Sequence, residues 1–168
     1  MKRAAKQRLW LAGGVAILVA MAGWQWRQDS AQAPGTLLPN DPATIHDVAL
    51  AIGNGPMEHF TRRDGHWWRT DGTPARADDG RLGELADTAA AAVLSWRPAT
   101  DFDPAKIGLA TPVAVLTLDG QRIEFGETSV TGPQRYVRVG DRIALISVRY
   151  TPRLAASESR ALKTGKDQ

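Results

Sequence analysis

The chain has 168 residues, of which 43% are apolar and 23% are charged, and its formal net charge is +3. This length suits one domain with an appendage and excludes a multi-domain machine. The absence of cysteine excludes a disulfide framework, a thiolate zinc site and a cysteine nucleophile.

The basic character of the chain comes from its N-terminus. Residues 1–30 carry one acidic side chain, Asp29, and five basic ones, which are Lys2, Arg3, Lys6, Arg8 and Arg27. Residues 31–168 carry 16 basic and 17 acidic side chains, so the body of the protein is about neutral. A neutral body argues against nucleic-acid binding, although the sequence pI is near 9.6.

Residues 9–26 (LWLAGGVAILVAMAGWQW) form an apolar run in which Gln25 is the only strongly polar member. A helix of this length at about 1.5 Å per residue spans roughly 27 Å, close to the thickness of a hydrocarbon core. Trp10 stands at one end of the run and Trp24 and Trp26 at the other, where amphipathic rings prefer the headgroup level. The sequence therefore predicts a transmembrane signal anchor over residues 9–26 that contacts membrane lipid.

The basic residues before this run predict its orientation. Positive charge stays on the cytoplasmic side, so residues 1–8 are expected in the cytoplasm and the rest of a single-pass inner-membrane protein in the periplasm. A cleaved secretory signal is the alternative, because Ala20-Met21-Ala22 fits a cleavage site before Gly23. The tryptophans beyond that site favour the uncleaved anchor, and both routes export the body.

The segments on either side of the body have the composition of connecting chain. Residues 27–42 (RQDSAQAPGTLLPNDP) are rich in Pro, Gly, Ser, Asn and Asp and predict a linker. Residues 155–168 lack apolar periodicity beyond Leu162 and predict a disordered tail. A periplasmic domain is therefore expected over residues 43–154.

Turn signals divide this domain into strands. Val48, Leu50 and Ile52 alternate with acidic or small residues and predict a half-buried strand. Three glycine-containing pairs lie between strand-like runs and predict hairpins; they are Asp64-Gly65, Asp119-Gly120 and Gly140-Asp141.

One long amphipathic helix is predicted between the first and second hairpins. Its apolar side chains follow at helical spacing, and they are Leu82, Leu85, Ala86, Ala89, Val93 and Trp96. Asp78-Asp79 offers an N-cap and Arg97-Pro98 a stop. The expected fold class is α+β: a mainly antiparallel sheet built from β-hairpins, with this helix packed on one face, preceded by a single N-terminal transmembrane helix.

Several short motifs follow one another in order over residues 43–150. They are Asp64-Gly65 with Trp68, Pro74, Ala77-Asp78, Ile107-Gly108-Leu109 with Pro112, Asp119-Gly120, Phe125-Gly126 and Arg135-Tyr136-Val137. This ordered set resembles the domain-of-unknown-function 4340 family of membrane-anchored bacterial envelope proteins. Members of that family often accompany ABC-transporter components, and the family has no established catalytic residue or ligand. The resemblance implies a membrane-anchored envelope protein.

The polar residues that could suggest chemistry have simpler structural interpretations. The three histidines, His46, His59 and His66, match no metal-binding helix spacing. Asp101 and Asp103 are interpreted as caps of a short turn that contains Pro104, rather than as a catalytic carboxylate pair. The sequence therefore predicts neither an enzyme nor a cofactor or metal site.

Trp67 and Trp68 are adjacent in a predicted strand, so their rings face opposite sides of the sheet. The family resemblance implies that Trp68 is the core member, which leaves Trp67 exposed or beneath a linker. An exposed tryptophan anchors protein partners or stacks on sugar rings. Trp67, with Arg135 and Arg138 of a later strand, is the candidate partner-binding surface.

These observations predict a non-catalytic, membrane-anchored periplasmic accessory or interaction module of a bacterial envelope complex. The expected partner is another envelope protein, such as an ABC-transporter component. The alternative is a periplasmic module that binds glycan or another ligand and is released or tethered after export. Both interpretations exclude nucleic acid as a partner.

Overall fold

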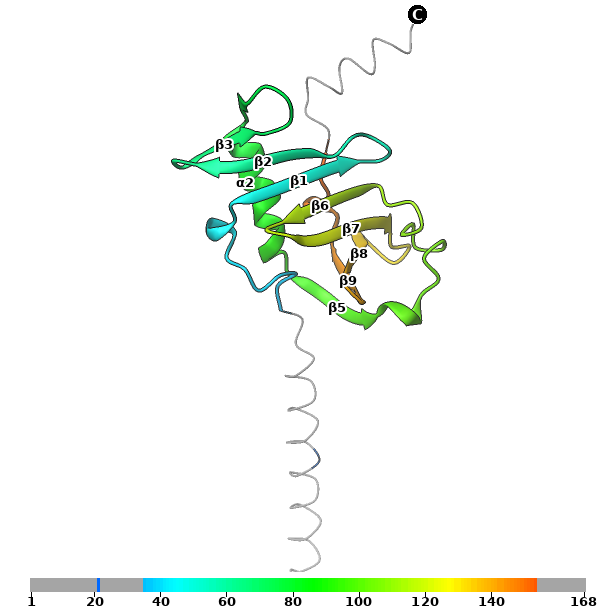
Figure 1. Cartoon of the computed structure of the whole chain (residues 1–168). Coiled ribbons are helices and arrows are strands. Elements are labelled where there is room, and N and C mark those ends of the chain that lie inside the picture. Colours follow the sequence, from blue (N-terminus) through cyan, green and yellow to red (C-terminus); the bar gives the residue numbers. More distant parts are fainter. Residues whose placement is uncertain (1–20, 22–34, 154–168) are drawn as a thin grey trace, which may run out of the picture. The chain divides into compact units, whose positions relative to one another are not determined.

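The computed structural model describes residues 35–153 and Met21. The chain divides into two compact units, residues 1–33 and 34–168, and every strand with defined bounds lies in the second. There, nine strands form one antiparallel sheet in the order β4-β3-β2-β1-β6-β7-β8-β9-β5 (Figure 1).

The elements follow one another as short strands joined by tight turns. The first four strands are β1 (Asp47–Ile52), β2 (Glu58–Arg63), β3 (His66–Arg69) and β4 (Ala75–Arg76). Helix α2 (Asp79–Ala86), the 3-10 turn η2 (Asp87–Ala90) and β5 (Val93–Pro98) come next. The last four strands are β6 (Ala114–Leu118), β7 (Gln121–Thr128), β8 (Gln134–Val139) and β9 (Arg142–Ser147). Further 3-10 turns are η1 (Pro42–Thr44), η3 (Ala99–Asp101) and η4 (Val148–Tyr150).

The three hairpins expected from the glycine-containing pairs are present as β2–β3, β6–β7 and β8–β9. Asp64 and Asp119 have φ values of 51° and 44°, and the glycines that follow them have φ values of 80° and 83°. Positive φ at both central positions is the type I′ turn, whose twist matches that of the flanking strands.

The expected fold class is wrong, because the long amphipathic helix does not exist. Helix α2 ends at Ala86 after about two turns, and η2 extends it only to Ala90. Val93 and Trp96, assigned above to the apolar face of that helix, lie in strand β5. The domain is thus a nine-stranded antiparallel sheet with one short helix.

The expected transmembrane helix is not among the structured elements described. No helix within the described residues combines the length and apolar character that a membrane span requires. The predicted anchor over residues 9–26, with Trp10, Trp24 and Trp26, lies outside the described residues apart from Met21.

A β-bulge in β5 explains why the spacing of Val93 and Trp96 is also typical of a helix. Side chains on one face of a regular strand are two residues apart, whereas Val93 and Trp96 are three apart. The register with β9 shifts between Val93 and Ser95, so Val93 lies opposite Ile146 and Trp96 opposite Ala144. The extra residue of the bulge lets both side chains face the core. A spacing of three is therefore common to a helix and to a bulged strand.

Backbone hydrogen bonds from the first described residues compete with continuation of the helix. The Leu37 N–H donates to the Ala91 carbonyl at 3.0 Å, and the Leu38 N–H donates to the Ala89 carbonyl at 2.9 Å. Leu37 and Leu38 are themselves each only 3% exposed. Residues 35–42, assigned above to the linker 27–42, therefore belong to the domain. Residues 27–34 and the predicted tail 155–168 lie outside the described residues.

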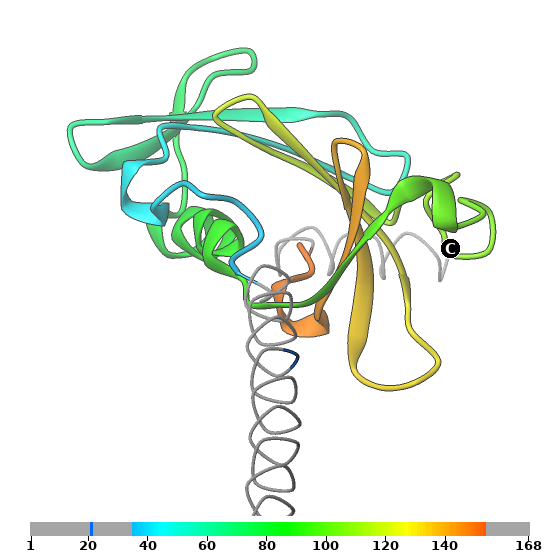
Figure 2. The same cartoon turned by 90° about the horizontal axis from the view of Figure 1, so that it is seen from below.

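The core lies between one side of the curved sheet and a covering layer made by α2, η2 and residues 35–45 (Figure 2). The sheet contributes alternating buried side chains, among them Val48, Leu50, Leu116, Leu118, Ile123, Phe125, Val137 and Ile146. The covering layer contributes Leu37, Leu38, Ile45, Leu82, Leu85, Ala86 and Ala89. Each large apolar side chain buried here stabilises the fold by about 1.5–3 kcal/mol.

The opposite face of the sheet is only partly covered. Ile107 and Leu109, in the connection between β5 and β6, pack against Ile143 of β9. Gly126 of β7 allows this approach, because a Cβ there would lie 2.2 Å from the Ile107 carbonyl oxygen. The face above β1, β2 and β6 carries half-buried small side chains, which are Ala49, Ala51, Thr61 and Thr117.

Candidate functional site

Trp67 is buried, so the predicted partner-binding surface loses its central residue. Its side chain is 3% exposed and belongs to the main core. Trp68 is half-buried on the opposite face, beside Thr61 of β2. The expectation that Trp68 is the core member and Trp67 is exposed is therefore wrong, whereas the alternative of a covered Trp67 agrees with its burial. Strand alternation predicts that the two rings diverge, but the position of the covering layer decides which ring is buried.

Arg135 and Arg138 project from opposite faces of β8, because they are three residues apart in a regular strand. Arg135 lies opposite Ile146, on the core side, and donates to the Gly126 carbonyl and to the Thr128 hydroxyl. Burial lowers the pKa of the Arg135 guanidinium, whose Nε has no hydrogen-bond partner. This side chain therefore braces the β7–β8 loop.

Arg138 is neutralised within the sheet. Its Nε donates to Glu124 Oε2 at 2.6 Å, and Arg122 Nε donates to Glu124 Oε1 at 2.8 Å. Glu124 is only 6% exposed, so the two guanidinium groups cover its carboxylate. The structure thus brings none of Trp67, Arg135 and Arg138 together.

Three of the residues weighed above as chemical groups, His66, Asp101 and Asp103, have structural partners. His66 Nδ1 lies 2.9 Å from Asp79 Oδ2. Asp101 pairs with Arg97 at 3.0 Å, and Asp103 Oδ1 accepts from the Ala105 N–H at 3.0 Å. Within residues 35–153, no three His, Cys, Asp or Glu side chains come together as a metal site would require.

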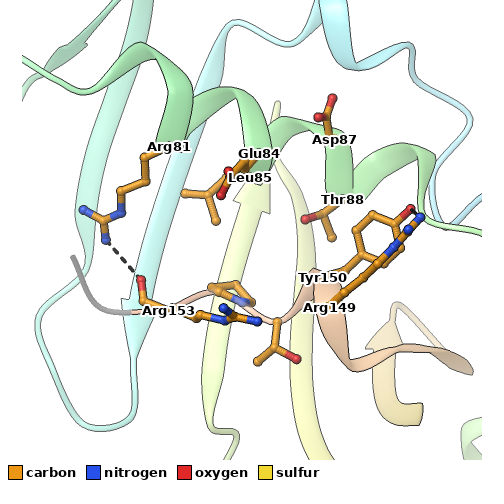
Figure 3. A pocket seen from close by; sticks show the side chains of 10 residues that line it. Arg81, Glu84, Leu85, Asp87, Thr88, Arg149, Tyr150 and Arg153 are labelled. Carbon is orange, nitrogen blue, oxygen red and sulfur yellow. Dashed lines mark hydrogen bonds between the residues drawn. The ribbon is translucent and has the colours of Figure 1, made fainter. Parts of the chain in front are cut away.

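A groove of about 440 Å³ separates the helical layer from the last described segment of the chain (Figure 3). Helix α2 and η2 form one wall, and residues 149–153 form the other. Its polar lining includes Arg81, Glu84 and Asp87 from the first wall and Arg149, Tyr150 and Arg153 from the second. We call this the arginine groove.

Local structure positions the helical wall of the groove. Asp78 Oδ1 caps α2 by accepting from the Gly80 and Arg81 N–H groups at 2.9 and 3.1 Å. Leu82 and Leu85 then face the core, 1% and 7% exposed. The helical period therefore leaves Arg81 and the exposed Glu84 at the rim.

The second wall leaves the sheet directly after β9. The Ser147 hydroxyl accepts from the Arg149 N–H at 3.5 Å, and this places η4 at the end of the strand. Pro152 is buried and fastens the segment to the domain, while Arg149 and Arg153 on either side are exposed. The segment therefore presents two guanidinium groups to the groove.

Arginines at the groove differ from most arginines of the sheet. Within residues 35–153, the ion pairs formed by arginine involve Arg69, Arg76, Arg97, Arg122 and Arg138. In the same part of the chain, Arg81, Arg149 and Arg153 form none, although Glu84 and Asp87 line the same groove. The groove lining therefore carries three arginines against two carboxylates, and none of the three is held in an ion pair by a described side chain.

Two of these guanidinium groups are nevertheless held in place. Arg149 lies 4.5 Å from the centroid of the Tyr150 ring and donates to the Tyr150 hydroxyl. Arg81 Nη2 lies 3.5 Å from the Arg153 carbonyl oxygen, so it links the two walls (Figure 3). These contacts leave guanidinium N–H groups free to bind an anion.

A second groove, of about 420 Å³, lies between η1, the β2–β3 hairpin and α2. Its arginine, Arg62, donates to the Ala43 carbonyl at 3.1 Å and lies 6.0 Å from the Trp67 ring centroid. This side chain therefore joins η1 to the hairpin. The arginine groove is the better candidate for a binding site.

Sequence patterns did not reveal the arginine groove. Arg81 and Arg153 are 72 residues apart, and no local pattern joins a helix face to a segment at the end of the sheet. The sole local signal was the run Val148–Arg153, in which two arginines and a tyrosine fall within six residues. That composition is frequent at protein interfaces.

No family model, curated protein or solved structure matches the chain. The resemblance to the domain-of-unknown-function 4340 family therefore stays a prediction.

Proposed function

We propose that this protein is a non-catalytic, membrane-anchored interaction module of a bacterial envelope complex. In this proposal, residues 9–26 anchor it as a single-pass protein of the inner membrane, and the domain lies in the periplasm. The apolar length of the run and the basic residues before it support that orientation. The partner is another envelope protein, such as an ABC-transporter component, as the family resemblance suggests.

The arginine groove is the observation that carries the proposal. Arginine and tyrosine are enriched among the residues that contribute most to protein–protein binding. Here Arg81, Arg149 and Arg153 surround a groove of about 440 Å³, with Tyr150 beside them. The groove offers both charge and shape to a partner.

The glycan-binding alternative has lost its main support. It depended on an exposed Trp67 as a stacking platform, and Trp67 is 3% exposed. The Arg149 guanidinium covers one side of the half-buried Tyr150 ring, 4.5 Å from its centroid. Trp67 therefore offers no stacking face to a sugar, and one face of Tyr150 is already occupied.

Crosslinking in living cells tests the proposal. The full-length protein is crosslinked, extracted from membranes in detergent and analysed by mass spectrometry. We expect one envelope protein to be recovered with the wild type and lost with Arg81→Ala/Arg153→Ala. A matched control, Arg63→Ala/Arg69→Ala, removes two exposed charges from the β2–β3 hairpin and should retain the partner.

Three results would contradict this proposal. If the groove variant recovers the same partner in the same amount, the groove is not the contact. If the wild type recovers no protein, the interaction role is wrong. If it recovers only peptidoglycan fragments, the glycan-binding alternative is favoured.

A further inference from the structure

We infer that the arginine groove binds an acidic peptide segment of its partner, through at least two carboxylates. This inference rests on the proposed function, because it names the chemistry that the partner presents to the groove. It follows from the charges, the geometry and the fixed side chains of the two walls.

Charge complementarity points to an anionic occupant. Arg81, Arg149 and Arg153 gather at one groove, and none of them has a carboxylate partner within residues 35–153. In the same part of the chain, five other arginines have such a partner, and Arg62, Arg63, Arg135 and Arg142 do not. Arginine presents a planar fork of N–H donors that matches the two oxygens of a carboxylate. A partner that brings carboxylates would supply the ion pairs that these three neighbouring arginines lack within the described residues.

The arrangement of the three guanidinium groups favours a chain over a single small anion. Figure 3 shows Arg81 and Arg149 toward opposite ends of the groove, with Arg153 on the wall that faces α2. A carboxylate that pairs with the arginine at one end leaves the arginine toward the other end without a partner. A peptide that carries several acidic side chains can lie along the groove and reach both.

The two walls are organised before the partner arrives. Arg149 is held against Tyr150, Arg81 reaches the Arg153 carbonyl, and the buried Pro152 fixes the segment between them. Side chains that are already ordered lose less conformational entropy when they bind. These held arginines therefore lose less conformational entropy on binding a carboxylate than unrestrained ones would.

One acidic side chain of the groove opposes this binding. Glu84 is exposed on the α2 wall and lowers the positive potential of the groove. The Asp87 carboxylate points away from the opposite wall in Figure 3. Neutralising Glu84 should therefore strengthen the binding of an acidic peptide, whereas removing the arginines should weaken it.

Binding of a simple acidic peptide tests the inference. The full-length protein is placed in phosphatidylcholine nanodiscs, and its binding of fluorescein-labelled decaglutamate is followed by fluorescence anisotropy. We expect decaglutamate to bind and decaglutamine not to bind. Arg81→Ala/Arg153→Ala should weaken binding about tenfold or more. Arg63→Ala/Arg69→Ala should change it by less than about twofold.

Two further variants distinguish specific binding of carboxylates by the groove arginines from a general attraction to positive charge. Glu84→Gln should tighten binding, because it removes the opposing charge and nothing that the core needs. Arg81→Lys/Arg153→Lys keeps the charge but loses the planar fork, and it should weaken binding by several-fold. Unchanged thermal unfolding of each variant shows that the fold is intact.

The inference is overturned if the groove and hairpin variants weaken decaglutamate binding equally, or if decaglutamine binds as well. It is also overturned if the groove variant loses binding to phosphatidylglycerol vesicles but keeps binding to decaglutamate. If partner recovery in cells depends on Arg81 and Arg153 while decaglutamate does not bind, the proposed function stands and this inference fails. If decaglutamate binds and no protein partner is recovered, the proposed function fails instead.

Discussion

The two faces of the nine-stranded sheet differ in how completely other elements cover them. One face is sealed by α2, η2 and residues 35–45, and it contains nearly all of the large buried side chains (Figure 2). The other face is covered only where Ile107 and Leu109 meet Ile143. Over β7 and β8, this second face holds a buried carboxylate, Glu124, between Arg122 and Arg138.

Charge follows the same division. On the open face, Arg122 and Arg138 are neutralised by the buried carboxylate of Glu124, while both guanidinium groups stay partly exposed. On the sealed side, Arg81 of the covering layer and Arg149 and Arg153 of the segment after β9 lie at the surface, with no described carboxylate partner. The sheet arginines therefore stabilise the fold, and the groove arginines remain free for binding.

The largest difference in stability between substitutions on the two faces should appear at the adjacent residues Trp67 and Trp68. Trp67→Ala removes a ring that is 3% exposed and should lower the free energy of unfolding by about 3–5 kcal/mol. Trp68→Ala, on the open face, should cost less than half as much, because its ring is already partly hydrated. Urea unfolding followed by circular dichroism measures both. An equal or larger loss for Trp68→Ala would contradict this assignment of the faces.

The cover over the open face depends on a close backbone approach. Gly126→Ala places a Cβ 2.2 Å from the Ile107 carbonyl oxygen, so the β5–β6 connection must move away. We expect a loss of about 1–3 kcal/mol. Gly132→Ala is the matched control, because its nearest contact is Gln134 Nε2 at 3.9 Å. Thermal unfolding of both variants measures this loss. Equal melting temperatures would show that packing of the β5–β6 connection contributes little to stability.

Glu124 forms ion pairs and Glu84 forms none within the described residues, so neutralising each one should affect stability differently. Glu124→Gln removes the charge that Arg122 and Arg138 share and should cost about 1 kcal/mol, since both arginines are partly hydrated. Glu84→Gln, at the groove, should change stability by less than about 0.5 kcal/mol. Urea midpoints provide the comparison. A similar loss for both glutamates would remove the distinction between sheet and groove.

The smallest effect on stability should come from Asp79, at the contact between α2 and β3, and it should appear only at acidic pH. Asp79 accepts hydrogen bonds from the Trp67 N–H, from His66 and from Arg76, and these hold the pKa of its carboxyl well below the usual range. A carboxyl with a lowered folded-state pKa stabilises the fold at pH values above its unfolded pKa, about 3.9, and loses that contribution as the pH falls further. Wild type should therefore lose more stability than Asp79→Asn between pH 5 and pH 3.

Urea titrations at those two pH values measure this difference. The other carboxylates titrate alike in both proteins, so only the difference between them reports on Asp79. A larger acid loss in Asp79→Asn than in wild type would contradict the assigned direction of the pKa shift.

Sequence patterns over a few residues predicted the turns, the alternation of side chains along strands and the helix cap, because interactions between near neighbours in the chain determine these features. The pairs Asp64-Gly65 and Asp119-Gly120 form their hairpins because positive φ is a property of two adjacent residues. Strand alternation placed Trp67 and Trp68 on opposite faces for the same reason. Asp78 was recognised as a helix cap, since its hydrogen bonds reach only two and three residues along the chain.

Long-range contacts controlled the rest. The predicted helix ended early because Leu37 and Leu38 bond to carbonyls some fifty residues away in the chain, and because a bulge in β5 places Val93 and Trp96 on one face. The covering layer, and no property of the Trp67-Trp68 pair, selected which ring is buried. The arginine groove exists because the segment after β9 lies beside α2, which brings Arg153 to Arg81 across 72 residues of sequence. Contacts at that separation depend on how the whole chain packs, and no local pattern of residues encodes them.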